Sequence, residues 1–216
     1  MTLCALSDVK TMLDIAVSDT TKDTKLNLMT KQVSARIINF IGYPVARATH
    51  TEEVRCVNNR QLIELRACPI QSVSAVSIAG VAITDYVILP EYAKFGMLYR
   101  GSGWVGNYYT RDMTYDPVSG FWDIKVTYDA GWYLPGDVDY TEGDEDSLPL
   151  DIQNAAMQAV IEWYRVNSSG SEGLKSHSEG GISDTWATTD PAHNPASGLS
   201  LGVCQMLEPY QRKGIA

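Results

Sequence analysis

Residues that commonly build catalytic or metal sites are few in this chain of 216 residues. No two cysteines have CxxC spacing, and the patterns HExxH, GxSxG, GxGxxG and the Walker phosphate loop are absent. His177 and His193 lie in a stretch rich in Ser, Gly and Pro, which is not expected to hold an imidazole rigidly. We therefore predict no catalytic residue, no metal site and no cofactor. The cysteines, which we expect to be free thiols, are Cys4, Cys56, Cys68 and Cys204.

A dense run of acids is the most distinctive chemical feature of the sequence. Six Asp and Glu residues, and no base, stand between residues 137 and 146. The run does not fit a calcium-binding EF-hand loop, because Glu142 stands where glycine is required and Leu148 where the bidentate glutamate belongs. We interpret it as a solvated loop, and as an alternative role we consider repulsion of DNA or contact with a partner. The acids assigned to that alternative role are Asp137, Asp139, Asp144, Glu145 and Asp146.

The net charge disfavours one broad class of function. The chain has 17 Lys and Arg residues against 26 Asp and Glu residues, which gives a formal net charge of -9. A protein this acidic is poorly suited to gripping nucleic-acid phosphates through a broad basic face. No apolar run approaches the roughly 18 residues that a membrane span requires, and residues 1–10 lack the pattern of a signal peptide. We expect a protein that is made in the cytoplasm and does not contact a membrane.

Helical periodicity dominates the N-terminal part of the chain. Ser7 is a candidate cap for a short helix that runs to about Ile15, with Val9, Met12 and Leu13 on one face. A longer helix is predicted over residues 21–41, ended by Gly42 and Pro44. Its apolar positions recur at intervals of three and four, which indicates one buried stripe. The stripe consists of Leu26, Met29, Val33, Ile37, Phe40 and Ile41.

The same periodicity returns in the last third of the sequence. Pro149 opens a helix through about Val166. Its apolar stripe consists of Ile152, Ala155 or Ala156, Ala159, Trp163 and Val166. Residues 167–181 are rich in Ser, Gly and Glu and are expected to form a flexible arm. A last short helix is predicted over residues 201–211. Its apolar face is formed by Val203, Met206, Leu207 and Tyr210.

The middle of the chain changes to the period of two that is typical of strands. Residues 49–57 and 61–65 predict two strands joined by a turn at Asn58, Asn59 and Arg60. Residues 73–78 predict a strand that is buried on both faces. The clearest alternation places Trp122, Ile124, Val126 and Tyr128 on one face of a strand. Further strands are predicted at 81–83, 86–89 and 97–99, and a long loop at 101–120.

Together these elements predict an α+β fold, in which a small α-helical bundle carries an inserted antiparallel β region and an extended C-terminal arm. The arm ends in the short helix. The expected boundaries are residues 1–47 and 149–166 for the helical core, 48–133 for the β region, 134–148 for the acidic loop and 167–216 for the arm.

Five short stretches, taken in order, resemble the head-tail connector (adaptor) proteins of tailed bacteriophages, in the longer versions that carry a β insertion. Residues 126–132 (VTYDAGW) match the family pattern V-x-Y-x-A-G-[YW], and Pro69–Val73 is similar to its Pro-[VI]-x-S-V. The stretches are residues 6–10 (LSDVK), 39–44 (NFIGYP), 65–73 (LRACPIQSV), 126–132 and 148–152 (LPLDI).

The resemblance implies a non-enzymatic virion protein of the neck, at the head-tail junction. Such a protein forms a ring, commonly of twelve copies, beneath the portal protein. The ring extends the DNA channel and offers a docking platform for the next head-completion (stopper) or tail-completion protein. Genomic DNA is expected to pass through the lumen without specific binding, because acidic walls repel phosphate.

The C-terminal segment is the predicted contact with the portal or with a neighbouring subunit. We expect residues 201–213 to dock there, with apolar anchors and two charged contacts. The anchors are Val203, Leu207 and Tyr210, and the charged contacts are Arg212 and Lys213.

An alternative reading is a binding module for a carbohydrate or another host ligand. The β region contains an aromatic-rich segment, and aromatic rings can stack on sugars. The aromatic residues concerned are Trp104, Tyr108, Tyr109, Tyr115 and Trp122.

Overall fold

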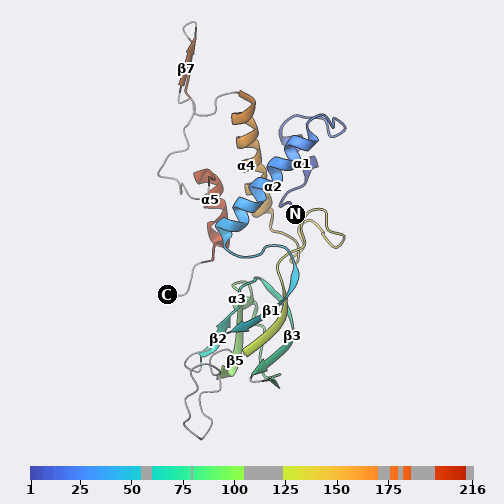
Figure 1. Ribbon diagram of the computed structural model, residues 1–216, viewed down its shortest axis with the longest axis vertical. Helices are drawn as coiled ribbons and strands as arrows, with labels where there is room; N and C mark the ends of the chain where they lie inside the picture. The colour runs from blue at the N-terminus through green and yellow to red at the C-terminus, as the bar shows by residue number, and fades with distance from the viewer. Residues whose placement is uncertain are drawn as a thin grey trace. The chain divides into compact units, whose positions relative to one another are not determined.

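The computed structural model of this chain describes residues 1–54, 60–78, 80–104, 124–169, 176–179, 182–185 and 198–212. The chain divides into two compact units: residues 1–42 with 134–216, which we call the helical unit, and residues 43–133, which we call the β unit. Figure 1 shows long helices in the first and sheets in the second. The α+β class predicted from the sequence is confirmed.

Helices α2 and α4 pack side by side in the helical unit, α1 contacts both of them, and α5 lies along α4 (Figure 1). The segment containing α5 runs antiparallel to α4, since Ser200 bonds to Glu162 and Tyr210 bonds to Asp151. The helices are α1 (Leu6–Met12), α2 (Asp23–Ile41), α4 (Leu150–Ser169), α5 (Leu201–Leu207) and the 3-10 helix η1 (Glu208–Tyr210).

The apolar stripe predicted for the second helix is confirmed for five of its six residues, while Phe40 at its edge is half-buried. α2 ends at Gly42 as predicted, because the left-handed backbone of this glycine (φ 91°) directs its N–H to the Ile38 carbonyl. The helix begins at Asp23 rather than Thr21, because the Asp19 carboxylate accepts hydrogen bonds from both the N–H and the hydroxyl of Thr21. The buried stripe residues are Leu26, Met29, Val33, Ile37 and Ile41.

The first helix differs from its prediction at both ends. It begins at Leu6 and ends at Met12, and the Ser7 hydroxyl donates to the Asp8 carboxylate instead of capping the helix. Met12 is 58% exposed, whereas Lys10 is buried. The Lys10 ammonium lies 2.5 Å from the Asp23 carboxylate and donates to the Val17 carbonyl. A buried lysine is tolerated when it is paired in this way.

The helix that follows the acidic loop is longer than predicted. Pro149 stands immediately before α4, and its carbonyl accepts the N–H groups of Ile152 and Gln153. The buried face is wide because α2 and α5 both pack against α4. Trp163 is half-buried and Val166 is 45% exposed, so the predicted stripe does not hold at its C-terminal end. The apolar residues buried on α4 are Ile152, Ala155, Ala156, Ala159, Val160 and Ile161.

The β unit contains a four-stranded antiparallel sheet in the order β1-β6-β3-β4 and a two-stranded sheet of β2 and β5. A short helix, α3 (Pro90–Ala93), precedes β5. In the remaining described segments of the chain, β7 (Ser176–Glu179) and β8 (Ile182–Thr185) form an antiparallel pair. The strands of the β unit are β1 (Ala48–Val54), β2 (Arg60–Glu64), β3 (Ile70–Ile78), β4 (Val81–Ala82), β5 (Met97–Trp104) and β6 (Ile124–Ala130).

Strand β6 confirms the strongest strand prediction. Ile124, Val126 and Tyr128 are fully buried, whereas Lys125 between them is exposed. Trp122, the first residue of the predicted strand, lies outside the described residues. The three buried side chains join one core with Ile63, Leu98 and Trp104 of the second sheet and with Leu65, which follows β2.

The predicted pairing of the first two strands is wrong for the residues that are described. β1 pairs with β6 along its whole length, and β2 pairs with β5. The turn signal at Asn58 is local, and it does not decide pairing when a distant strand offers a more apolar face. This register sets His50 opposite Tyr128 and Val54 opposite Ile124.

Two smaller strand predictions also fail. β3 is buried on one face only, since Ser72, Ser74 and Ala75 are exposed. Residues 86–89 do not form a full strand, because Val87 makes a single bridge to Tyr99 before Pro90 opens α3. β5 extends to Trp104, and residues 105–120 of the predicted loop lie outside the described part of the chain.

Candidate functional site

The predicted partner segment at the C-terminus is largely folded back on its own chain. Val203 and Leu207 are fully buried, and their helix α5 packs against α4. Ser200 caps α5 by accepting the Val203 N–H, and its hydroxyl donates to Glu162. Burial within the helical unit removes Val203 and Leu207 from the surface, so they are not available as partner anchors in this conformation.

The end of this segment remains partly exposed. The Tyr210 hydroxyl lies 3.5 Å from the Asp151 carboxylate, and the Arg212 N–H donates to the Ile41 carbonyl over 2.9 Å. Burial, and to a lesser degree the Asp151 charge, raise the pKa of Tyr210. The Arg212 bond satisfies a carbonyl at the end of α2. Lys213 lies outside the described residues, and the partner role of Tyr210, Arg212 and Lys213 stays a prediction.

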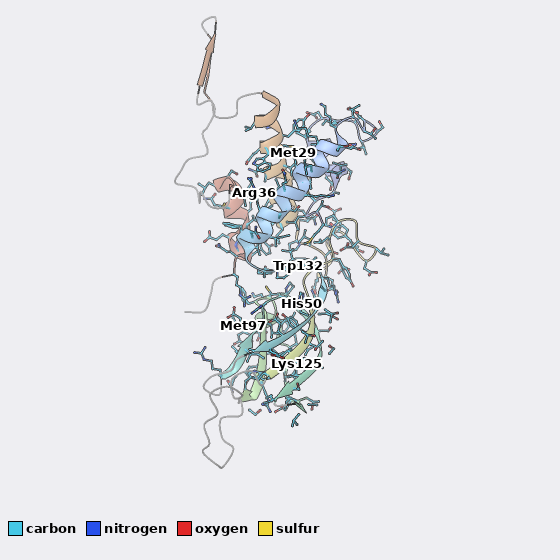
Figure 2. The ribbon with its side chains drawn as sticks, viewed as in Figure 1. Met29, Arg36, His50, Met97, Lys125 and Trp132 are labelled. Atoms are coloured by element: carbon cyan, nitrogen blue, oxygen red, sulfur yellow. The ribbon has the colours of Figure 1, made fainter. Side chains whose placement is uncertain are left out.

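Arg36 on α2 contacts both α4 and the residues that immediately precede α5. The Arg36 guanidinium stacks over the Trp163 ring, 3.9 Å from its centroid, and donates to the Gly198 carbonyl over 3.3 Å. Figure 2 labels Arg36 on α2. A Cβ atom on Gly198 would lie 2.8 Å from the arginine, so this position requires glycine or a displaced guanidinium.

The acidic loop has a defined backbone in the structure. Successive turns close the loop, with the Tyr140 N–H donating to Asp137 and the Ser147 N–H donating to Asp144. The Asp137 carboxylate accepts the Leu134 N–H over 2.7 Å. The loop is fixed to α4 because the Tyr140 hydroxyl hydrogen bonds with the Gln153 amide. The acids are therefore carried on a preformed surface.

Exposure of these acids agrees with the interpretation of a solvated loop. Asp137, Asp139, Asp144 and Glu145 are exposed, and Asp146 is partly exposed. No group of three or more potential metal ligands occurs within the described part of the chain. The acidic loop and the C-terminal segment meet the same end of α4, at Gln153 and Asp151 respectively. A role for the acids in repelling DNA or in facing a partner stays a prediction.

A cluster that the sequence analysis missed lies near the other end of α4. The ammonium groups of Lys22 and Lys25 lie 5.8 and 5.4 Å from the centroid of the Tyr164 ring. We call these two side chains the lysine pair. The sequence does show that Lys22 and Lys25 are three residues apart in a predicted helix, and such residues lie on the same face. It does not show that Tyr164 lies beside them, because that depends on the packing of α2 on α4.

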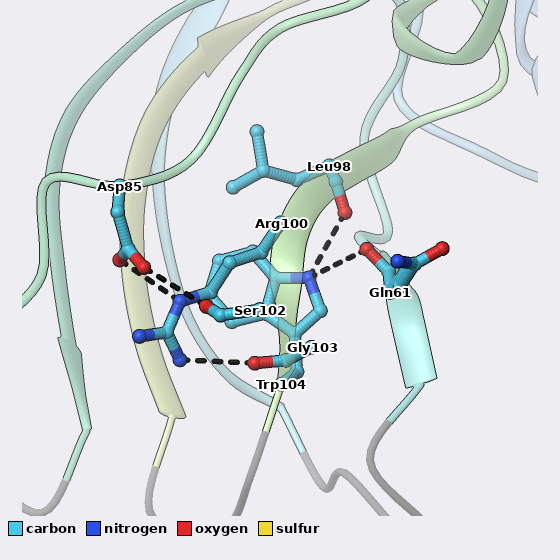
Figure 3. Close-up of polar contacts among 7 residues, drawn as sticks. All are labelled: Gln61, Asp85, Leu98, Arg100, Ser102, Gly103 and Trp104. Atoms are coloured by element: carbon cyan, nitrogen blue, oxygen red, sulfur yellow. Dashed lines mark hydrogen bonds and ion pairs between the residues drawn. The ribbon is translucent and has the colours of Figure 1, made fainter.

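The aromatic residue predicted to bind a ligand in the β unit is part of the core. Trp104 is fully buried, and its indole N–H donates to the Gln61 and Leu98 carbonyls (Figure 3). It therefore offers no surface for stacking on a sugar. The other residues of that prediction, Tyr108, Tyr109, Tyr115 and Trp122, lie outside the described residues.

Polar contacts around Trp104 fix the end of β5. The Asp85 carboxylate accepts hydrogen bonds from the Arg100 guanidinium and the Ser102 hydroxyl, each over 2.9 Å, and Arg100 also donates to the Gly103 carbonyl (Figure 3). The Arg100 hydrogen bond and then the Ser102 hydrogen bond lower the pKa of Asp85. These groups support the end of β5.

A second polar network lies inside the β unit. The Tyr128 hydroxyl donates to the Glu52 carboxylate and accepts the Ala67 N–H over 3.0 Å, and Glu52 also accepts the Arg66 N–H. Burial, followed by the bond to Glu52, raises the pKa of Tyr128. The network ties β1 and β6 to the chain that follows β2, which is a structural role.

One of three comparisons with known proteins gives matches, and these are solved structures. No family model matches the sequence, and no curated protein matches it. Among solved structures, a chain from the neck of an empty GTA particle, computed with C6 symmetry, matches with a TM-score of 0.56 and 14% identity. The match covers 99% of this chain and 92% of that chain.

A second structure, the virion of a native gene transfer agent (GTA) particle, matches with a TM-score of 0.53 and 12% identity, again over 99% of this chain and 92% of that chain. Likeness at this level of identity shows that the fold is shared. The aligned region spans both units, so the likeness is not confined to one of them. None of the helices in the described ranges is long and apolar enough to cross a membrane.

Proposed function

We propose that this chain is a structural protein of the neck of a tailed-phage-like particle, an adaptor that forms a ring beneath the portal. The observation that carries the proposal is the match to a chain in a particle neck, which covers 99% of this chain at a TM-score of 0.56. The five sequence stretches that resemble phage connector proteins also support this proposal.

The chemistry of the described residues favours a binding role over a catalytic one. The titratable groups with clearly shifted pKa values include Asp85, Tyr128 and Asp129, and each makes hydrogen bonds to other residues of the β unit. Shifted pKa values arise in structural networks as well as in active sites. We therefore propose that the protein is not an enzyme and uses no cofactor.

In the proposed role, copies of the chain repeat around the particle axis, in a ring that we expect to contain twelve copies. The ring would join the portal on one side and a head-completion (stopper) or tail-completion protein on the other. It would extend the channel through which genomic DNA passes without specific binding, because a chain with a formal net charge of -9 repels phosphate. Tyr210, Arg212 and Lys213 are the proposed contacts with the portal or a neighbouring copy.

The test is to mix the full chain with rings of the portal protein from the same particle and to image the mixture by negative-stain electron microscopy. We expect a second, co-axial ring on one face of the portal. Portal rings alone, and portal rings mixed with an unrelated acidic protein of similar mass, serve as controls. Portals that remain bare at saturating concentrations of the chain would contradict the proposed function.

A further inference from the structure

The lysine pair is an exposed cationic group at the start of α2. Lys22 is the residue that precedes α2 and Lys25 lies in its first turn, where the helix dipole and unpaired N–H groups favour negative charge. Both side chains are exposed and both ammonium groups lie within 6 Å of the centroid of one ring, so two like charges are held close together. The Asp19 carboxylate offsets part of this charge through its attraction to Lys22, whereas Asp23 in the same turn is paired with Lys10. A bound anionic surface would offset more of it.

The acidic loop is an anionic surface whose charge is complementary to that of the lysine pair. Six acids and no base stand between residues 137 and 146, and bonds between Tyr140 and Gln153 fix the loop in place. Asp139 and Glu145 are exposed on it. Because the loop is already shaped, a partner that binds it does not have to order it.

The two surfaces cannot meet within one molecule. The acidic loop is attached at Gln153 and the lysine pair lies over Tyr164, which are eleven residues apart on α4. At 1.5 Å per residue this separation is about 16 Å along the helix. Complementary patches at the two ends of one helix are suited to contact between copies that repeat in the same orientation.

We propose that, in the assembled ring, the lysine pair of one copy binds the acidic loop of the next copy. The inference rests on the proposed function, since it describes the contact through which ring subunits join. A ring requires two different surfaces on each subunit that complement one another, and these surfaces meet that requirement. Such a contact contributes orientation and rate of association, and its strength falls as salt is added.

The test is charge reversal in the full chain, with ring formation on portal rings as the readout. Lys22→Glu with Lys25→Glu should reduce ring formation by about tenfold or more, because like charges then face each other across the contact. Asp139→Lys with Glu145→Lys should have the same effect. A variant with all four substitutions should recover ring formation to within about threefold of the wild type.

Loss of the fold does not explain the first of these results, because glutamates at the start of α2 are favoured by the helix dipole. The matched control is Lys31→Glu with Lys94→Glu, which reverses two exposed lysines elsewhere and should leave assembly unchanged. Binding of a 30-base-pair DNA duplex is measured in parallel, since phosphate could also occupy the lysine pair.

The outcomes separate the inference from the proposed function. Wild-type chain that forms no ring on portals would overturn the proposed function, and the inference with it. Wild-type chain that forms rings would sustain the function, and the inference would then be overturned by any one of three results. These are rings formed normally by both charge-reversed pairs, failure of the fourfold variant to recover, and a Lys22→Glu, Lys25→Glu variant that assembles normally but has lost DNA binding.

Discussion

The two units of this protein are assembled in opposite ways. The β unit is one continuous stretch, residues 43–133, and its core contains the buried rings of Trp104 and Tyr128. The helical unit joins segments from both ends of the chain, and α5 is secured to it by Leu207, by Ser200 and by the Arg212 N–H at the end of α2. We therefore expect substitutions in the β unit to disturb the geometry of its strands. Substitutions in the helical unit should instead weaken the packing between segments that are distant in the sequence.

The largest expected difference between the two units is seen by comparing two glycines, one in each unit, that have similar backbone conformations. Gly131 in the β unit has φ +96°, and an added Cβ would lie 2.6 Å from the Ala46 carbonyl oxygen. Gly136 in the helical unit has φ +101° with nothing within 4 Å of such an atom. Gly131→Ala should lower the free energy of unfolding by about 4 kcal/mol or more, and Gly136→Ala by about 1–2 kcal/mol. Urea denaturation measures both, and equal losses would contradict this account of Gly131.

The next effect tests whether α5 belongs to the core of the helical unit. Leu207→Ala should reduce stability by about 2–4 kcal/mol, because Leu207 is fully buried. Met206→Ala on the same helix should change stability by less than about 0.5 kcal/mol, because Met206 is 41% exposed. Amide hydrogen exchange should show lost protection in α2 and α4 but not in β6. Equal loss in both units would mean that they unfold as one.

A smaller effect is expected from the buried tyrosine of the β unit. Tyr128→Phe removes the acceptor of the Ala67 N–H, which is buried, and should cost about 1–3 kcal/mol. The folded state raises the pKa of Tyr128, so its contribution to stability is complete below the unfolded pKa of about 10 and is lost as the pH rises above it. Wild-type stability should therefore fall above pH ~10, and less so in the variant. Identical alkaline profiles would contradict this role of the hydroxyl.

The smallest effect concerns the exposed carboxylate beside β5. The Arg100 and Ser102 hydrogen bonds lower the pKa of Asp85, so the folded state favours its ionised form. That contribution is present above the unfolded pKa and is lost as the pH falls through the folded value. Arg100→Gln should raise the Asp85 pKa toward its usual value in an NMR titration, with Ser102→Ala giving a smaller rise. An Asp85 pKa that both variants leave unchanged would contradict the assignment.

Local patterns in the sequence were sufficient to predict the helices and strands that are buried along a single face. The three-and-four spacing of Leu26, Val33 and Ile37 predicts the buried side of α2, and Gly42 predicts its end. The alternation of Ile124, Val126 and Tyr128 predicts β6 in the same way. In each case, burial follows from a period that a short window of sequence already contains.

Features that depend on distant segments could not be predicted. The turn at Asn58 suggested that β1 pairs with β2, but β6, far along the chain, supplies the actual partner of β1. The lysine pair required Tyr164 to be brought to α2, and Lys10 is buried because Asp23 pairs with it. Val203 and Leu207 were recognised as an apolar face, but α4 of the same chain, not another protein, covers them.

The most direct test of the neck assignment is to make particles without this chain and to count attached tails by electron microscopy. The account predicts filled or partly filled heads whose portals carry no neck ring and no tail, with attachment restored when the full chain is supplied. Particles that lack the chain but attach tails at the wild-type frequency would contradict the central claim.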